Sequence, residues 1–151
     1  MTSSDDLFVF YDTETTGLDI NFSQIIQIGS VLTDSNFKIL DELNLSSQVL
    51  PWVVPSPDAF LVHKQTDCLE NGLSHFEMMR TLREKWLSWG KEKNLIFVSY
   101  NGHRFDEELV RRQFYWNLFD PYITNTNGNR RLDLMSPVSY THLTLPTKRI
   151  V

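Results

Sequence analysis

Acidic residues near the start of the chain could bind a divalent cation. Asp12 and Glu14 follow the apolar run Leu7–Tyr11, and alternate residues of a strand project from the same face. Two carboxylates held that close repel each other unless a cation lies between them. Their hard oxygen atoms suit Mg²⁺ or Mn²⁺. The same pattern also occurs in solvated turns, so this pair alone does not identify a site.

A third acid, Asp106, comes after a second apolar run, Leu95–Tyr100, and opens a helical segment. An acid in the first turn of a helix also interacts favourably with the helix dipole, which is a structural alternative. If both apolar runs are strands of one sheet, the three carboxylates lie at the same edge. Sites of this kind hold two metal ions roughly 4 Å apart and catalyse phosphoryl transfer. We therefore predict a two-metal site there.

Hydrophobic periodicity and turn residues predict the elements that position these acids. Four segments have the pattern of strands: Leu7–Tyr11, Gln24–Thr33, Phe37–Leu45 and Leu95–Tyr100. Two segments have helical spacing of apolar residues: Ser74–Trp89 and Phe105–Leu118. Asp34-Ser35-Asn36 has the chemistry of a hairpin turn, and another element begins at Leu132–Met135. Strands followed by helix, strand and helix indicate an α/β fold with a mixed sheet.

Composition restricts the class of protein. The chain has 151 residues, of which 41% are hydrophobic and 22% charged, as in a single globular domain. One cysteine, Cys68, excludes an intramolecular disulfide framework and a cysteine-rich zinc site, and we expect a cytoplasmic protein. No apolar run approaches the roughly 20 residues that span a bilayer, so no membrane partner is expected. The net charge of −5 does not by itself favour a nucleic-acid partner.

Two motifs resemble those of a known enzyme family. Asp12–Leu18 after an apolar strand resembles the first motif of the DEDD 3′→5′ exonucleases, and Asn101–Asp106 resembles the second. The segments Phe114–Tyr122 and Arg131–Met135 are similar to the exodeoxyribonuclease I branch, although the second motif also resembles that of animal DNA-degrading relatives. The resemblance covers residues 7–135. It implies a ribonuclease H-like mixed sheet, in which a three-strand antiparallel meander precedes helix–strand–helix.

The resemblance also implies an activity and a set of site residues. The expected activity is hydrolysis of single-stranded DNA with a free 3′ end to nucleoside monophosphates. Asp12, Glu14 and Asp106 would be catalytic and would coordinate two Mg²⁺ ions, for which Mn²⁺ can substitute. Five residues would contact the substrate: Thr15, Gly17, Leu18, His63 and Phe105. Leu18 would act as a wedge against a base, and a surface or helix-capping role is the alternative for His63.

The third motif of this family, His-x-x-x-x-Asp, is absent from the sequence. Its histidine would act as the general base, and its aspartate would supply a fourth carboxylate. The residues five positions after the four histidines are Cys68, Arg80, Glu108 and Thr147. We therefore predict that the domain is incomplete at its C-terminus. The parent protein would be an exonuclease, and this fragment by itself would be inactive.

The last residues do not continue the family pattern. Val138–Thr147 resembles a translated sequencing-library adapter, so we predict that residues 136–151 are a non-native tail. A native but divergent C-terminus is the alternative. The predicted organisation is a disordered start at 1–6, the N-terminal portion of an exonuclease domain at 7–135, and this tail. The sequence does not predict the oligomeric state.

Other functions remain compatible with these patterns. They are an RNA-trimming or proofreading exonuclease of the same superfamily, a non-catalytic nucleic-acid-binding domain, and an unrelated α/β protein whose acids are structural. Arg111-Arg112 and Arg130-Arg131 could contact phosphates, although paired arginines more often bridge acids such as Glu107 and Glu108. The cluster Phe114–Trp116 could stack bases, although its helical spacing favours core packing.

Overall fold

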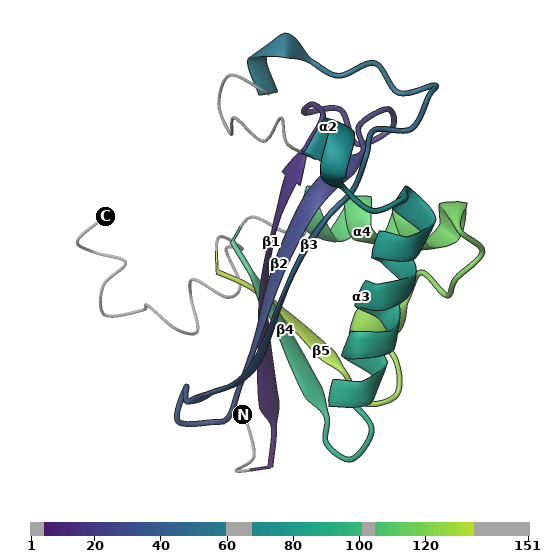
Figure 1. The fold of residues 1–151 in the computed structure, drawn as a ribbon. Coiled ribbons are helices and arrows are strands. Elements are labelled where there is room, and N and C mark those ends of the chain that lie inside the picture. The colour runs from purple at the N-terminus through teal and green to yellow at the C-terminus, as the bar shows by residue number, and fades with distance from the viewer. Residues whose placement is uncertain (1–4, 60–67, 101–104, 135–151) are drawn as a thin grey trace, which may run out of the picture.

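The computed structural model describes residues 5–59, 68–100 and 105–134, and within these ranges it contains one five-stranded sheet with helices on one face (Figure 1). The strands are β1 (Leu7–Thr15), β2 (Ile25–Thr33), β3 (Ile39–Ser46), β4 (Leu95–Ser99) and β5 (Arg130–Asp133). The helices are α2 (Cys68–Asn71), α3 (His75–Trp89) and α4 (Asp106–Trp116), with a 3-10 turn η1 at Ile123–Asn125. No helix in these ranges is long and apolar enough to cross a bilayer.

The sheet is mixed, as predicted, with strand order β3-β2-β1-β4-β5. β1, β2 and β3 form an antiparallel meander, whereas β4 pairs parallel with β1 and β5 pairs parallel with β4. The predicted turn joins β2 to β3, because the Asp34 carboxylate accepts the N–H groups of Asn36 and Lys38 at 2.9 and 3.0 Å. β1 is therefore the strand on which the two halves of the sheet meet.

The first strand is longer than its apolar run predicts. β1 continues past Tyr11 to Thr15, because β2 pairs with it as far as Thr15↔Ile25. The pairing shifts between Glu14 and Thr15, so β2 contains a bulge at Ile26. This places Asp12 and Glu14 inside a strand. Bulges occur often beside active sites because they redirect side chains.

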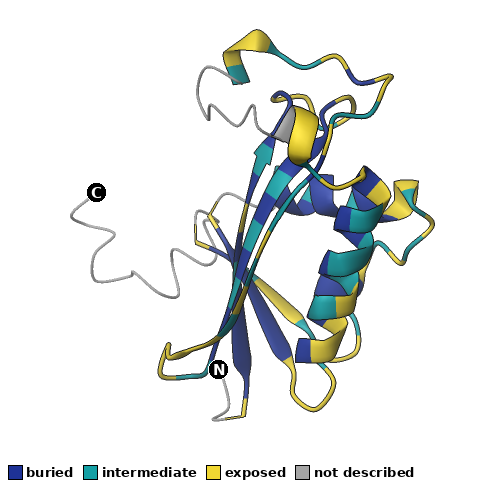
Figure 2. Cartoon of the chain, viewed as in Figure 1, coloured by how far each residue is buried: buried dark blue, intermediate teal, exposed yellow. Residues whose placement is uncertain are grey.

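The main core lies between the sheet and the helices α3 and α4 (Figure 2). Trp86 is fully buried at its centre, with its ring 5.4 Å from Tyr11, 4.8 Å from Phe97 and 6.1 Å from Phe114 between centroids. Its indole N–H donates to the Ser30 hydroxyl at 2.9 Å, which satisfies the polar atom inside the core. This core fixes the orientation of β1 relative to both helices.

The predicted helix ends are close to those observed. Ser74 caps α3 by accepting the Glu77 N–H at 3.2 Å, and Gly90 ends the helix. The helical spacing of apolar residues in the sequence also predicts Phe76 and Leu118 on the inner sides of these two helices, but neither residue is buried. Phe76 is 45% exposed, since Met78 and Met79 take the inner positions of the first turns. Leu118 is 92% exposed because it lies beyond the end of α4.

A buried polar network joins α3, α4 and β2. The Gln113 side-chain oxygen accepts the Ile25 N–H at 2.9 Å and lies 2.9 Å from Nε2 of His75. The Asn117 amide donates to the Gln113 carbonyl at 2.7 Å and lies 3.2 Å from Nδ1 of His75. Burial lowers the pKa of the His75 imidazole, so the ring is neutral at pH 7. A neutral ring satisfies both contacts by donating from Nε2 and accepting at Nδ1.

We predict that Gln113→Leu destabilises the protein by about 3 kcal/mol. The substitution leaves the Ile25 N–H and the His75 ring without their buried acceptor, and each such loss costs roughly 1–3 kcal/mol. The same replacement at the exposed Gln48 should cost less than about 0.5 kcal/mol. Urea denaturation of both variants measures the difference, and equal effects would show that the network contributes nothing to stability.

Candidate active site

The two acids of the first motif lie on the face of β1 that points away from the helices. Val9 and Tyr11 belong to the main core, whereas Phe8 belongs to a smaller cluster on the other face, with Phe10 packed against it. Because side chains alternate along a strand, Asp12 and Glu14 share the face of Phe8 and Phe10. Asp12 is exposed and Glu14 is half-buried.

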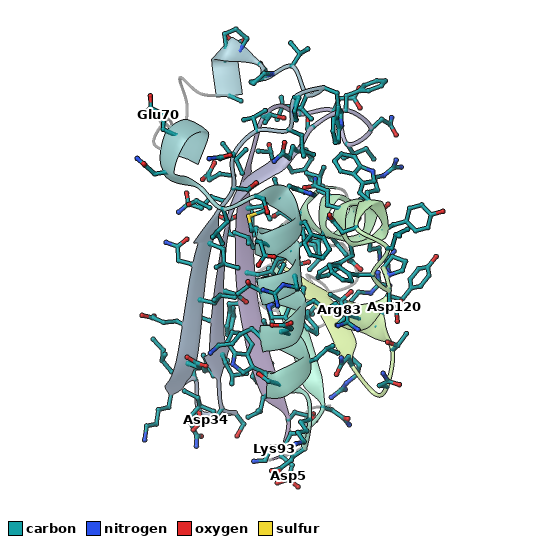
Figure 3. The ribbon with its side chains drawn as sticks, turned by 45° about the vertical axis from the view of Figure 1, so that its right-hand side comes forward. Asp5, Asp34, Glu70, Arg83, Lys93 and Asp120 are labelled. Atoms are coloured by element: carbon teal, nitrogen blue, oxygen red, sulfur yellow. The ribbon has the colours of Figure 1, made fainter. Side chains whose placement is uncertain are left out.

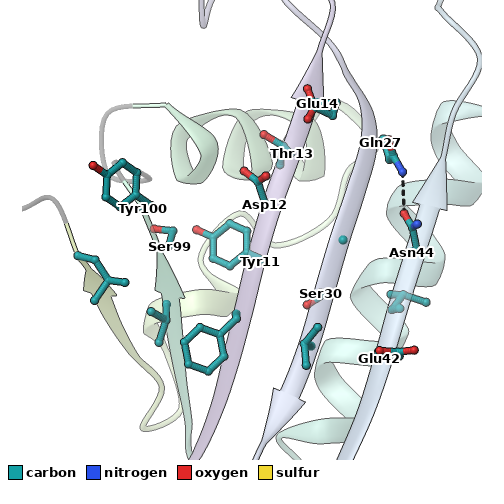
Figure 4. A pocket seen from close by; sticks show the side chains of 16 residues that line it. Tyr11, Asp12, Thr13, Glu14, Gln27, Ser30, Glu42, Asn44, Ser99 and Tyr100 are labelled. Atoms are coloured by element: carbon teal, nitrogen blue, oxygen red, sulfur yellow. Dashed lines mark hydrogen bonds between the residues drawn. The ribbon is translucent and has the colours of Figure 1, made fainter. Parts of the chain in front are cut away.

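Asp12 and Glu14 line a groove of about 950 Å³ that crosses β1, β2, β3 and the end of β4 (Figure 4). Gly29 pairs with Asp12 across the β1–β2 ladder, and a side chain at Gly29 would meet no atom within 4 Å. Open space therefore lies beside the Asp12 carboxylate. Tyr100, at the end of β4, is 68% exposed and lines the same groove. The groove offers carboxylate oxygens and one accessible aromatic ring to a ligand.

Asp106 begins α4 at the same end of the sheet and is buried. Its carboxylate accepts a hydrogen bond from the Thr13 hydroxyl. Burial raises the pKa of Asp106 to about 6; the Thr13 hydrogen bond opposes this rise, and the charges of Asp12 and Glu14 add to it. The three acids are therefore close enough to interact electrostatically, and their neighbours leave part of the negative charge uncompensated.

The structure does not gather the three carboxylates at one point. Thr13 lies on the helix-facing side of β1, so its hydrogen bond holds Asp106 on the side opposite to Asp12 and Glu14. Across residues 5–59, 68–100 and 105–134, no group of three His, Cys, Asp or Glu residues is close enough to hold one ion. The donor set still fits a hard divalent cation, since it consists of carboxylate oxygens with uncompensated charge. The Thr13 hydroxyl donates to one of the two oxygens of the Asp106 carboxylate.

Other charged residues at this edge were not predicted as part of the site. Asp133 ends β5 beside Ser99, is 2% exposed, and its charge further raises the pKa of Asp106. Glu107, also 2% exposed, pairs with Arg131 and, at 3.1 Å, with Arg111. Sequence reasoning could have found Asp133, because it ends a short extended segment just as Asp106 follows one. Arg111 lies four residues after Glu107 on α4, so spacing along the chain indicates that pair, whereas only the fold brings Arg131 of β5 to Glu107.

The residues predicted to contact the substrate differ in their exposure. Leu18 is 89% exposed at the turn after β1, where it is free to meet a ligand. Thr15 and Gly17 are buried, and the Thr15 hydroxyl donates to the Gly17 carbonyl at 2.7 Å. Phe105 is half-buried and packs against the main core. His63 lies outside the described residues.

A second buried glutamine holds this turn in place. The Gln24 N–H donates to the Thr16 hydroxyl at 2.9 Å, and the Gln24 side chain accepts the Leu50 N–H at 2.8 Å. The Ser56 N–H in turn donates to the Thr16 carbonyl at 2.6 Å. A side chain at Gly17 would come within 3.0 Å of the Ser23 hydroxyl, so the close approach favours glycine. The position of Leu18 is therefore set by contacts to two loops.

We predict that Asp106→Asn stabilises the metal-free protein, on the order of 2 kcal/mol at about pH 7.5. The folded-state pKa of about 6 lies above the unfolded value of 3.8, so ionisation of Asp106 opposes folding increasingly as the pH rises between these values. The stability gained by Asp106→Asn should be about half as large at pH 5 as at about pH 7.5. It should disappear near the pKa that Asp106 has in the unfolded chain.

Thermal denaturation in EDTA at the two pH values measures this gain, with Asp58→Asn, at an exposed aspartate, as the matched control. In Mn²⁺ the wild-type protein should be more stable than Asp106→Asn, because only the wild-type carboxylate can hold the ion. A gain that is the same at both pH values would mean that burial of the Asp106 charge is not its cause.

Comparisons with known proteins agree with these features. The profile of the RNase_T family, described as Exonuclease, matches residues 9–147. Exodeoxyribonuclease I of Buchnera aphidicola subsp. Schizaphis graminum is 30% identical over 139 residues, which is 87% of this chain and 27% of that protein. Oligoribonuclease of Francisella tularensis subsp. tularensis is 32% identical over 85 residues, covering 56% of this chain and 42% of that protein.

Solved structures show the same fold. Exonuclease I from Methylocaldum szegediense superimposes with a TM-score of 0.80 at 29% identity, over 93% of this chain and 30% of that one. Escherichia coli exonuclease I in complex with a dA16 oligonucleotide gives a TM-score of 0.81 at 24% identity, over 93% of this chain and 31% of that one. The chain thus spans about a third or less of the exonuclease I proteins that it matches. Because the profile covers most of its length, the chain belongs to the exonuclease family.

Proposed function

We propose that this chain supplies the carboxylate half of a 3′→5′ exonuclease site that acts on single-stranded DNA. The observation that carries the proposal is the placement of Asp12 and Glu14 on one open face of β1, with Asp106 at the same end of the sheet. The family supports nuclease chemistry, and a relative with the same fold was solved with a dA16 oligonucleotide. The activity of the whole protein is part of the proposal, because the chain spans only a fraction of its relatives.

Asp12, Glu14 and Asp106 would hold Mg²⁺, with Mn²⁺ as a substitute. When bound, two such ions stabilise the attacking and leaving oxygens of a phosphodiester and lower the pKa of bound water. In this chain, Asp12 and Glu14 face the open groove where a phosphate could enter. Thr13 orients the Asp106 carboxylate by donating a hydrogen bond to one of its oxygens. Leu18 presents an exposed apolar side chain to the terminal base.

The general base is not supplied by the motif that this family uses. No histidine of the 151-residue sequence has an aspartate five positions later. We therefore propose that the chain binds a 3′ end but does not hydrolyse it, and that activity requires additional sequence with the His-x-x-x-x-Asp pattern. A cytoplasmic location belongs to the same proposal, and its support is the single cysteine.

A second candidate is an RNA-trimming exonuclease with the same three carboxylates. The similarity to oligoribonuclease favours it, although that match covers 56% of the chain against 87% for exodeoxyribonuclease I. The 2′-hydroxyl of each nucleotide is the group that distinguishes the two substrates. The described residues contain no contact that selects between them.

Hydrolysis of 5′-labelled oligonucleotides tests the proposed function. The 151-residue chain should leave both substrates intact in Mg²⁺. A protein extended with the genomic sequence beyond codon 135 should shorten single-stranded DNA stepwise from its 3′ end. Asp12→Asn in the extended protein should lower the rate by at least about 1000-fold, because members of a metal site act together.

A matched RNA oligonucleotide in the same assay decides between the two candidates, since faster cleavage of RNA would select the RNA-trimming function. Asp58→Asn in the extended protein is the control and should cleave at the wild-type rate. Hydrolysis by the extended protein that survives Asp12→Asn would overturn the assignment of the site.

A further inference from the structure

The first turn of α4 is attached to two strands of the sheet. Its first residue, Asp106, accepts a hydrogen bond from Thr13 of β1. Its second residue, Glu107, forms an ion pair with Arg131 of β5. In the strand order, β4 lies between β1 and β5, so the two attachments are roughly 10 Å apart. The first turn of the helix is thus held on both sides of β4.

The start of α4 has no capping side chain. The residue before the helix is Phe105, whose side chain has no polar atom to accept a backbone N–H. α3, by contrast, begins after Ser74, which accepts the Glu77 N–H. The orientation of the first turn of α4 therefore depends on its attachments to the sheet and on packing, and not on a cap.

Glu107 has two arginine partners that come from different elements. Arg111, one turn later on α4, lies 3.1 Å from the Glu107 carboxylate, and Arg131 reaches it from β5. The Glu107 side chain is 2% exposed, whereas those of Arg111 and Arg131 are 19% and 33% exposed. Both arginines compensate the buried charge. Of the two, only Arg131 connects the helix to the sheet.

The two attachments restrict rotation of α4 about its own axis. Consecutive residues of an α-helix point about 100° apart, which lets Asp106 reach β1 while Glu107 reaches β5. A rotation that moved Asp106 away from Thr13 would also change the distance from Glu107 to Arg131. The ion pair therefore resists the motion that would displace the Asp106 carboxylate.

We propose that Arg131 is a positioning residue for the metal site, because its ion pair with Glu107 holds the Asp106 carboxylate where a divalent cation can bind. This inference rests on the proposed function and extends it to a residue that acts on the site only through others. Arg131 acts through Glu107 and the backbone of the first helical turn. Replacing a residue that orients a metal ligand commonly changes metal affinity by about 10- to 100-fold.

Core packing is the alternative explanation for the position of Asp106. Leu109 and Val110, in the next turn of α4, are buried in the main core and could fix the helix by themselves. In that case Arg131 would contribute to the stability of the protein but not to the binding of an ion. Metal affinity, measured on folded protein, separates the two explanations.

A titration of the 151-residue chain with Mn²⁺, followed by the electron paramagnetic resonance signal of the free ion, tests the proposal. Arg131→Met should weaken Mn²⁺ binding by at least about tenfold. Removal of a positive charge near a bound cation would by itself tighten binding, so a weakened affinity identifies a loss of positioning. The variant should fold, because Arg111 continues to pair with the buried Glu107.

Two control variants remove the same charge. Arg111→Met also deprives Glu107 of one arginine but leaves the helix attached to β5. Lys93→Met acts beside Asp5, at the end of the sheet where β1 and β4 begin (Figure 3). Both controls should bind Mn²⁺ at least as tightly as wild type, since neither releases the first turn of α4 from the sheet.

Arg131→Lys is the second variant, and it decides the matter if Arg131→Met does not fold. It keeps the positive charge, so a purely electrostatic role predicts no change in Mn²⁺ affinity. A flexible ammonium group holds a carboxylate less firmly than a planar guanidinium does, so positioning predicts an affinity about threefold weaker. An unchanged affinity in Arg131→Lys would contradict the proposal.

A double-mutant cycle in EDTA tests the same geometry without the metal. Thr13→Val removes the hydroxyl that donates to Asp106. It should raise the equilibrium constant for unfolding by about fivefold in the wild type and in Arg111→Met, but by less than about twofold in Arg131→Met. The hydrogen bond should lose its contribution only where the first turn of α4 is no longer held by β5.

Equal Mn²⁺ affinities of Arg131→Met and Arg111→Met would overturn the inference, and so would additive effects of Thr13→Val and Arg131→Met on stability. A wild-type chain that binds no Mn²⁺ would instead contradict the metal site of the proposed function. The double-mutant cycle would then decide by itself whether Arg131 positions Asp106. A failure of the inference and a failure of the proposed function are therefore distinguishable.

Discussion

The alternation of side chains along β1 is the constraint on which the rest of the structure depends. Val9 and Tyr11 anchor the strand to the helices, and this requires Asp12 and Glu14 to face the open groove. A slip of one residue would bury both acids in the main core and expose its apolar side chains. Burial of the apolar face therefore fixes the position of the acidic face without any direct contact to it.

Two buried glutamines connect strand β2 and the turn after β1 to neighbouring elements. Gln113 binds the start of β2 to α4, and Gln24 binds the turn after β1 to the loop that contains Leu50. Both satisfy backbone N–H groups that would otherwise be buried without partners. Neutral hydrogen bonds therefore hold the start of β2 and the turn after β1. Burial of the Asp106 carboxyl group is the main cause of its raised pKa, and the charges of Asp12 and Glu14 add to the rise.

Strands and helices with strong apolar patterns were predicted well. The polar end of a strand, which has no apolar pattern, was not predicted. Leu95–Tyr100 and Ser74–Trp89 match β4 and α3 to within one residue at each end. β1 was predicted to end at Tyr11, because its last four residues are polar and are held in the strand by pairing with β2. Phe76 was assigned to the core from helical spacing alone, yet the sheet faces a different side of the first turn.

The sequence by itself determined the identity of the acids and their common face on β1, because a period of two is a local property of a strand. It also determined the α/β class, since the order of strand and helix patterns is local too. Only the tertiary structure decided that Thr13 holds Asp106 on the far side of β1, and that Asp133 lies beside them. It alone brought Arg131 of β5 to the Glu107 carboxylate on α4. Such contacts join residues from different elements, and spacing along the chain does not contain that information.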